Sequence, residues 1–322
     1  MLELKKLRFR YQQFGGLRMV KAYFKMGVLP FVIWETLRVL LLRRPLKEAY
    51  PAISGKVLPV LQKQYKPLLK LLAQKYDKMN LEHVKNDTIY SSWMQGMENA
   101  PKLVKTCMAT RKKFIPNKEF VVITNDNISN YVKFPDYIDD KCKKGIIPYS
   151  HSTDLLRLEL LIKYGGTWID STVLCTNDNY PKDMLDSELF LYHFQDSKKD
   201  EFTGISSWFI SAYSNNKLLM ILRDMLYQYW KDYDCLIDYF VLHKFFWMIE
   251  EEFPKEINSM PKYSSYDALQ MALYLDKPYD AGIMEQLLCN SSFHKLDYRK
   301  NAIVTAKGEK TFYAHIIENY GD

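Results

Sequence analysis

The sequence predicts an α/β domain, and two stretches of the chain carry that prediction. In residues 87–124, an extended segment, a helix beginning near Pro101 and a second extended segment follow in order. That order is typical of parallel strands joined by a helix. In residues 152–172, a mostly apolar helix, two glycines and a short strand lead to a carboxylate. α/β enzymes form their sites at the carboxyl ends of such strands.

The helix of the second stretch is expected to begin at Ser152 or Thr153, because either side chain can accept hydrogen bonds from the first turn. Its leucines cover most of the circumference, so the helix should be buried on most sides. Gly165 can adopt the left-handed conformation that ends a helix. The strand that follows is expected to continue through residues 172–174.

Two pairs of polar residues interrupt this apolar background. Asp154 and Arg157 are three residues apart and project from one side of the helix start. Asp170 and Thr172 are two residues apart and share one side of an extended segment. Taken singly, each has a structural alternative in which Asp154 caps the helix, Arg157 pairs with it and Asp170 starts a turn. Taken together they favour a site, because burying charge without a purpose is costly.

These motifs resemble those of a known family. The run Ser/Thr-Asp-Leu-Leu-Arg, then Lys-Tyr-Gly-Gly, then Trp-Ile-Asp-x-Thr is similar to the sugar-binding region of the capsular polysaccharide synthesis proteins, which are related to the Asp-x-Asp sugar-binding glycosyltransferase family 32. The likeness covers roughly residues 85–300. It implies a GT-A type, Rossmann-like nucleotide-sugar-binding domain, a nucleotide-sugar donor, and transfer that retains the anomeric configuration.

The resemblance also assigns roles to residues. Asp170, Arg157 and Asp154 are the catalytic candidates, and the last two are assigned to the hydroxyls of the donor sugar. The residues assigned to the donor as a whole are Trp93, Gln95, His151, Asp154, Arg157, Asp170, Thr172, His294 and Lys295. His294 and Lys295 are the candidates for the diphosphate. A packing role remains open for Trp93, and a capping or packing role for His151.

On the acceptor side, the candidates are Trp208, Asp238, Tyr239 and His243. Trp208 lies among apolar neighbours and is either a wall of the sugar pocket or part of the core. The other three fall in the first turns of a helix expected over residues 238–252, where a cap and packed aromatic residues are the alternative.

A divalent cation, Mn²⁺ or Mg²⁺, is expected in the Asp-x-Asp pattern because hard ions prefer oxygen ligands. Asp170 and Thr172 are its candidate ligands, but the hydroxyl of Thr172 replaces the second carboxylate and is a weaker ligand. No pair of carboxylates stands out as nucleophile and acid–base catalyst, which argues against glycoside hydrolysis.

Charge divides the chain into two regions. Residues 1–80 hold 17 Lys and Arg against 4 Asp and Glu, whereas the remainder is acidic. We expect a basic helical region over residues 1–85 and the GT-A domain over residues 86–322. The N-terminal region either rests on an anionic membrane surface or packs on the catalytic domain. A nucleic-acid arm is not favoured, because no recognition module accompanies the charge.

Within the N-terminal region, the apolar run over residues 28–42 is shorter than the roughly 20 residues of a membrane span. Residues 56–85 are expected to form one or two helices, broken or begun at Pro59 and Pro67. The five scattered cysteines fit a reducing, cytoplasmic setting. The expected location is therefore the cytoplasm, peripheral to the inner face of the cell membrane.

Further elements are expected downstream: strands over residues 187–194 and 206–211, a helix capped by Asn215, and a helix over residues 280–288. Two functions follow from these expectations. The first is a glycosyltransferase that adds a sugar to a polysaccharide or a lipid-linked oligosaccharide in surface glycan synthesis. The alternative is a non-catalytic nucleotide-sugar or glycan-binding module with a degenerate Asp-x-Asp site.

Overall fold

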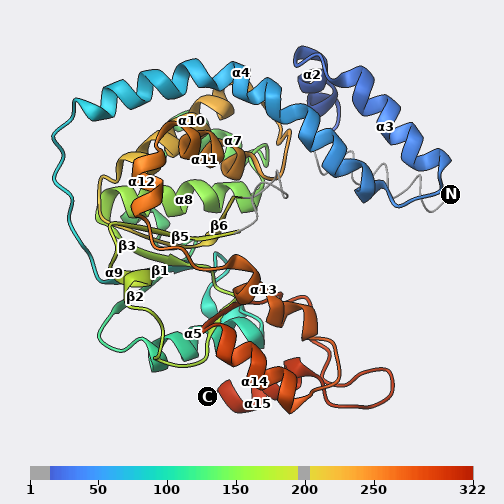
Figure 1. Ribbon diagram of the computed structural model, residues 1–322, viewed down its shortest axis with the longest axis vertical. Coiled ribbons are helices and arrows are strands. Elements are labelled where there is room, and N and C mark those ends of the chain that lie inside the picture. Colours follow the sequence, from blue (N-terminus) through green and yellow to red (C-terminus); the bar gives the residue numbers. More distant parts are fainter. Residues whose placement is uncertain (1–14, 195–203, 322) are drawn as a thin grey trace.

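A five-stranded mixed sheet forms the centre of the protein in the computed structural model, which describes residues 15–194 and 204–321 (Figure 1). The first three strands across the sheet are parallel to one another, and the fourth pairs antiparallel with both the third and the fifth. Their order across the sheet is β2 (Glu119–Ile123), β1 (Thr88–Ser92), β3 (Gly166–Ile169), β6 (Ile205–Ala212) and β5 (Leu189–His193). The α/β class and the parallel pairing of the first two strands are thereby confirmed.

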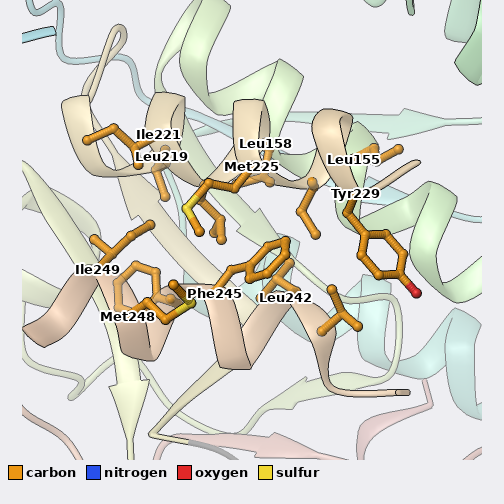
Figure 2. Packing of buried hydrophobic residues seen from close by; sticks show 14 of the residues in the cluster. Leu155, Leu158, Leu219, Ile221, Met225, Tyr229, Leu242, Phe245, Met248 and Ile249 are labelled. Carbon is orange, nitrogen blue, oxygen red and sulfur yellow. The ribbon is translucent and has the colours of Figure 1, made fainter. Parts of the chain in front are cut away.

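One face of the sheet is covered by helices that pack as two layers. They are α8 (Tyr149–Tyr164), α10 (Lys217–Asp232), α11 (Val241–Glu252) and, across the outside, α4 (Tyr50–Asp77). Figure 2 shows side chains of α8, α10 and α11 meeting in one apolar core. Leu155 and Leu158 of α8 are fully buried there, as are Met225 and Phe245. This core supports the strand that carries Asp170.

The opposite side carries α5 (Lys102–Phe114) and the C-terminal helices α13 (Ser265–Tyr274), α14 (Ala281–Asn290) and α15 (Phe312–Tyr320). A second, two-stranded antiparallel sheet joins them, formed by β4 (Val173–Cys175) and β7 (Phe293–Lys295). The shorter helical segments are η2 (Met97–Asn99), α6 (Ile128–Tyr131), α7 (Asp136–Lys143), α9 (Asp183–Asp186) and α12 (Pro254–Ser259).

The start of α8 differs from the expectation. The helix begins at Tyr149, and the extended backbone of Pro148 precedes it. The hydroxyls of Ser152 and Thr153 do not cap; both donate to the carbonyl of Tyr149 within the first turns. Because proline fixes its own backbone angle and suits helix starts, it sets the boundary one turn earlier.

The strand after the two glycines is shorter than expected. β3 ends at Ile169, the chain turns through residues 170–172, and the amide of Val173 bonds the carbonyl of Asp170 at 3.1 Å. Residues 173–175 then belong to the second sheet and do not prolong β3. Asp170 and Thr172 consequently lie on a turn between two sheets.

Helix starts downstream also differ by a few residues. Asn216, and not Asn215, caps α10, because its side chain accepts from the amides of Leu218 and Leu219. α11 begins at Val241, so that Asp238 and Tyr239 precede the helix.

The N-terminal part consists of α2 (Leu17–Lys25), α3 (Leu29–Leu41), η1 (Leu46–Ala49) and α4. Figure 1 shows α2 and α3 at one end of α4, beyond the rest of the molecule. The basic and aromatic alternation predicted over residues 1–14 lies outside the described residues. Of the helices that the structure describes, none is long and apolar enough to cross a membrane.

α4 passes through both of its prolines, so the expected break at Pro59 and Pro67 is wrong. Each proline lacks an amide hydrogen and removes one helical bond. Tertiary packing compensates, because one side of the helix is buried against α10 and α11 in the core shared with α8. The expected boundary near residue 85 falls in the extended connection between α4 and β1.

The two glycines at the junction of α8 and β3, Gly165 and Gly166, have left-handed backbone angles and little space around their Cβ positions. Gly166 has φ +99°, and an added Cβ would lie 2.5 Å from the carbonyl oxygen of Thr88 on β1.

We expect Gly166→Ala to lower the free energy of unfolding by about 3–4 kcal/mol, from left-handed strain plus overpacking. Urea unfolding measures this. Gly308 is the matched control, since it has φ +82° but open space around its Cβ position; Gly308→Ala should cost only about 1–2 kcal/mol. Equal losses in the two variants would contradict the close approach of β1 and β3.

Candidate functional site

Asp170 lies at the carboxyl end of β3 and accepts bonds at both carboxylate oxygens. Its Oδ1 accepts from Trp168 Nε1 at 2.8 Å and faces Arg157 Nη2 at 3.4 Å. Its Oδ2 accepts from Lys295 Nζ at 2.8 Å. The backbone of Asp170 is held as well, because its amide bonds the carbonyl of Trp208 on β6 at 2.8 Å. The carboxylate is thus fixed from three elements.

Lys295 reaches this point from β7, which pairs with β4. Its ammonium donates to Asp170 Oδ2 and also to Thr172 Oγ1, the latter at 2.7 Å. The pairing of Val173 with Lys295 brings the lysine beside the turn. About a quarter of the Lys295 side chain is exposed, so the charged end adjoins solvent.

Arg157 and Asp154 come from α8 on the other side of Asp170. Arg157 Nη1 lies 3.1 Å from Asp154 Oδ1 and donates to the carbonyl of Ser207 at 2.6 Å. The guanidinium also lies over the ring of Trp168, 5.2 Å from its centre. The structure therefore brings Asp154, Arg157, Asp170, Thr172 and Lys295 into one cluster.

The charges in this cluster shift one another. Burial would raise the pKa of Asp170, but Lys295 and Arg157 outweigh it and hold that pKa below its usual range. Burial raises the pKa of Asp154, and the attraction of Arg157 does not cancel that effect. One carboxylate is therefore firmly ionised, whereas the other takes up a proton more readily.

His151 lies beside Asp154, with Nε2 3.9 Å from Asp154 Oδ2. Its ring is buried edge-on against Trp230, and Nε2 lies 3.3 Å from the carbonyl of Tyr239. Burial lowers the pKa of His151. The histidine packs behind Asp154 as a neutral ring.

Arg111 was not among the sequence-predicted residues, yet it holds the turn that carries Asp170. The side chain is 1% exposed. It donates to the carbonyls of Ile169, Asp170 and Val173, with the Asp170 bond at 2.5 Å. Burial lowers its pKa to about 10, so it stays cationic at neutral pH. Its position one helical turn after Cys107, on the apolar side of α5, was the available signal.

Aromatic and polar side chains lie around the cluster. Trp93, just after β1, packs edge-on against Tyr298 at 5.5 Å between ring centres. Gln95 is exposed in the same loop. Tyr239 is about half exposed, and the charges of Asp154, Arg157 and Asp170 act on its hydroxyl. Trp93 is partly buried, whereas Gln95 and Tyr239 are exposed to solvent.

The structure does not bring His294 to the cluster. Neighbouring residues of a strand point to opposite faces, so His294 points away from the side on which Lys295 meets Asp170. It is fully buried, and burial lowers its pKa to about 4. Alternation on β7 thus separates two residues that the sequence analysis assigned together to the diphosphate.

Of the four acceptor-side candidates, Trp208 and Asp238 are buried and His243 is partly buried. Trp208 is stacked on Tyr192, with ring centres 4.6 Å apart, in an apolar cluster beside the sheet. His243 is packed edge-on against Phe240, and burial lowers its pKa to about 3. Asp238 is covered by α4. These side chains do not face solvent beside Asp170, and Tyr239 alone of the four does so among the described residues.

Asp238 instead joins the N-terminal helices to the rest of the protein. Tyr50 donates to it at 2.8 Å, Ser54 donates to its other oxygen, and the amide of Phe240 donates at 2.7 Å. Lys244 lies 3.6 Å away and is equally buried. Asp238, which the sequence pattern suggested as an acceptor-side residue, thus belongs to a buried ion pair with Lys244.

The residues present fit a divalent cation poorly. Hard ions take oxygen ligands, preferably carboxylates, but both oxygens of Asp170 already face N–H groups and Thr172 supplies only a hydroxyl. Across residues 15–194 and 204–321, no three or more His, Cys, Asp or Glu side chains are grouped closely enough to hold a metal ion. Lys295 lies between the two residues that the sequence analysis named as ligands.

A cavity of about 680 Å³ lies elsewhere, between the end of α4 and the start of α10. Tyr76, Asn216 and Glu256 are among its lining residues, and none of Asp154, Arg157, Asp170, Thr172 and Lys295 borders it. It is therefore separate from the cluster around Asp170.

The sequence matches the family described as "Capsular polysaccharide synthesis protein" over residues 44–316. No curated protein matches the chain. A solved structure described as "PaToxG Glycosyltransferase" is similar at 14% identity and a TM-score of 0.36, with 62% of this chain and 80% of that chain covered. That likeness is too small to bear on the site.

Buried neutral histidines make stability depend on pH. His243 and His294 have folded pKa values of about 3 and 4, below the ordinary value of 6.5. The unfolded chain therefore binds protons that the folded state excludes, and stability present above pH 6.5 is lost as the pH falls. Each histidine contributes up to about 1.4 kcal/mol per pH unit. We expect urea unfolding to give a lower free energy of unfolding at pH 5 than at neutral pH. In His294→Asn, the slope of the free energy of unfolding against pH should lack the contribution of one histidine.

Exposed His83 supplies the matched substitution, and the slope of His294→Asn is compared with that of His83→Asn. Burial also raises the pKa of Glu250 to about 7, which opposes the histidine effect. The informative quantity is thus the difference in slope between variant and unchanged protein. An identical slope in His294→Asn would contradict the neutral, buried state of that ring.

Proposed function

The chain belongs to the capsular polysaccharide synthesis protein family, and on that premise we propose that it is a glycosyltransferase. It moves a sugar from a nucleotide-sugar donor to a polysaccharide or lipid-linked oligosaccharide acceptor. Family membership supports the glycosyltransferase role. The observation that carries the proposal is the cluster of Asp154, Arg157, Asp170 and Lys295 at the carboxyl end of β3.

The chemistry of transfer suits this cluster. Breaking the bond between sugar and diphosphate leaves negative charge on the phosphate, and fixed positive groups stabilise it. Lys295 is the partly exposed cation nearest the end of β3 among the residues of the cluster. The carboxylates of Asp154 and Asp170 accept hydrogen bonds from sugar hydroxyls, and Arg157 orients both.

We also propose the GT-A type of domain and a retaining reaction. The mixed sheet, with the parallel strand β3 ending just before Asp170, is compatible with that type. Asp154 and Asp170 both lie close to the guanidinium of Arg157. In glycoside hydrolases, by contrast, one carboxylate is a free nucleophile or base and a separate carboxylic acid protonates the leaving group. In a retaining transfer, the leaving phosphate takes the proton of the incoming hydroxyl. Trp93 and Gln95 are assigned to the nucleotide side, and Tyr239 to the acceptor side.

A non-catalytic binding module is the second candidate, and one observation favours it. Both oxygens of Asp170 are engaged by donors, and the second acidic position of the motif is Thr172. Such a site could hold a nucleotide sugar without breaking it. Hydrolysis or transfer by the purified protein separates the two candidates.

The N-terminal helices support a second part of the proposal, a membrane-facing surface for a lipid-linked acceptor. On α3, Ile33, Trp34, Leu37 and Leu41 are exposed and lie on one side, because they are three or four residues apart. Trp34 is 56% exposed and Leu41 is 83% exposed. The buried residues of this helix, Glu35 and Val39, lie on the opposite side.

Charge points to an anionic partner for this surface. On α2, the exposed side carries two large apolar residues and three basic ones: Leu17, Arg18, Lys21, Phe24 and Lys25. Arg43, Arg44 and Lys47 are exposed just after α3. Mixed apolar and basic sides are typical of helices that lie on anionic lipid. We accordingly propose a peripheral position at the cytoplasmic face of the cell membrane.

Asp170→Asn tests the catalytic role. Replacing one charged oxygen with an amide removes the partner of Lys295 and Arg157, and we expect transfer or donor hydrolysis to fall about 100-fold or more. The assay uses a panel of common UDP-, GDP-, CDP- and dTDP-sugars with and without acceptor extract. Asp178→Asn, at an exposed residue in the loop after β4, is the control. Unchanged turnover in Asp170→Asn would remove the residue from the active site.

Vesicle co-sedimentation tests the membrane surface. We expect the full chain to bind vesicles of phosphatidylglycerol and phosphatidylcholine, and to bind phosphatidylcholine alone weakly. Replacing Trp34, Leu37 and Leu41 together with Ser should reduce binding at least about tenfold, because three apolar contacts are lost.

The control for that experiment is Leu273→Ser, which changes an equally exposed leucine on α13, away from α3. Loss of binding in both proteins, or in neither, would contradict a surface on α3. The circular dichroism spectra of all variants must match, since the substituted side chains are exposed.

A further inference from the structure

One ammonium group occupies the position where the Asp-x-Asp pattern would hold a divalent ion. Lys295 Nζ lies 2.8 Å from Asp170 Oδ2 and 2.7 Å from Thr172 Oγ1. These are the two side chains that the sequence analysis named as metal ligands. An ion bound to both would have to displace the ammonium or lie against its positive charge.

The charges of the two arrangements are equal. A divalent cation with a second aspartate adds one net positive charge next to the first aspartate. Lys295 with Thr172 also adds one, because the hydroxyl is neutral. At position 172 a neutral threonine stands where the pattern has an aspartate, and Lys295 carries one positive charge where a divalent cation carries two. The two differences therefore cancel in the net charge.

The lysine is held in place as a bound ion would be. Its strand, β7, is paired with β4 along its length, and the amide of the next residue, Leu296, bonds the carbonyl of Thr172 at 2.9 Å. An ammonium has three N–H groups, and Asp170 and Thr172 accept two. The third remains for a ligand on the partly exposed side.

We propose that Lys295 takes the place of the divalent cation, so that this protein binds the diphosphate of its donor without a metal ion. The inference rests on the proposed function, since it concerns the same site. Its chemical class of ligand is a nucleoside diphosphate, whose phosphate oxygens accept from the ammonium. No bond is made or broken in this binding step.

Calorimetry on the full chain tests the proposal with UDP, GDP, CDP, ADP and dTDP as probes. Each titration is run in a chelating buffer and again with MnCl₂. We expect at least one diphosphate to bind, with dissociation constants that agree within about threefold in the two buffers. Affinity lost in the chelator and restored by MnCl₂ would overturn the inference while leaving the proposed function standing. Absence of binding by every probe in both buffers would remove the proposed function and the inference with it.

Variants identify the residue. Lys295→Met should weaken binding of the diphosphate at least tenfold and leave binding of the corresponding nucleoside unchanged. Lys307→Met changes an exposed lysine of the loop before α15 and is the matched control. Equal affinities for the diphosphate in the unchanged protein and Lys295→Met would overturn the assignment.

A second variant covers the case in which Lys295→Met fails to fold. Combining Lys295→Met with Thr172→Asp rebuilds the acidic pair and removes the ammonium. This double variant should bind MnCl₂ by itself, and should bind the diphosphate at least tenfold more tightly when MnCl₂ is present. A double variant that is folded but indifferent to MnCl₂ would show that this position is no ion site, and the inference would fall.

Discussion

The arrangement depends on how two carboxylates are held in place by two cations, away from bulk water. Asp154 is buried and Asp170 is largely covered by protein, and an isolated carboxylate in such a place would be strongly destabilising. Arg157 lies between them, and Lys295 closes the other side of Asp170. Removing Arg157 would leave Asp154 without its guanidinium partner, and removing Lys295 would leave Asp170 with Arg157 alone. These ion pairs therefore stabilise the fold and also position the side chains of Asp154, Arg157, Asp170 and Lys295 next to one another.

Three separated parts of the chain must meet for this to happen. α8 supplies Asp154 and Arg157, the turn after β3 supplies Asp170 and Thr172, and β7 supplies Lys295. The leucine core of α8, α10 and α11 positions the first part against the sheet (Figure 2). Arg111 fixes the second through three backbone carbonyls. Pairing of β4 with β7 carries the third across more than a hundred residues.

Local sequence was sufficient for the parts that local rules determine. The strand–helix–strand order and the glycine pair gave the parallel strands and the turn, and the spacing of Asp154 from Arg157 put both on one side of α8. Long-range partners were beyond such rules. The sequence around residue 294 does not indicate whether His294 or its neighbour Lys295 points to the core. In the structure, His294 is the one that does. Pro59 and Pro67 lie inside a helix because packing outweighs their local preference. Arg111 looks like part of a basic run until its carbonyl partners are known.

The buried contact between the N-terminal helices and the loop before α11 has a consequence for the history of the chain. Tyr50 and Ser54 complete the hydrogen bonding of Asp238, and Lys244 lies beside it. A shorter ancestor without α4 would have exposed a pair of opposite charges and the apolar surface of α10 to water. The basic segment is therefore no detachable tag added to a finished domain. Joining either one to a different partner would require this interior to be rebuilt.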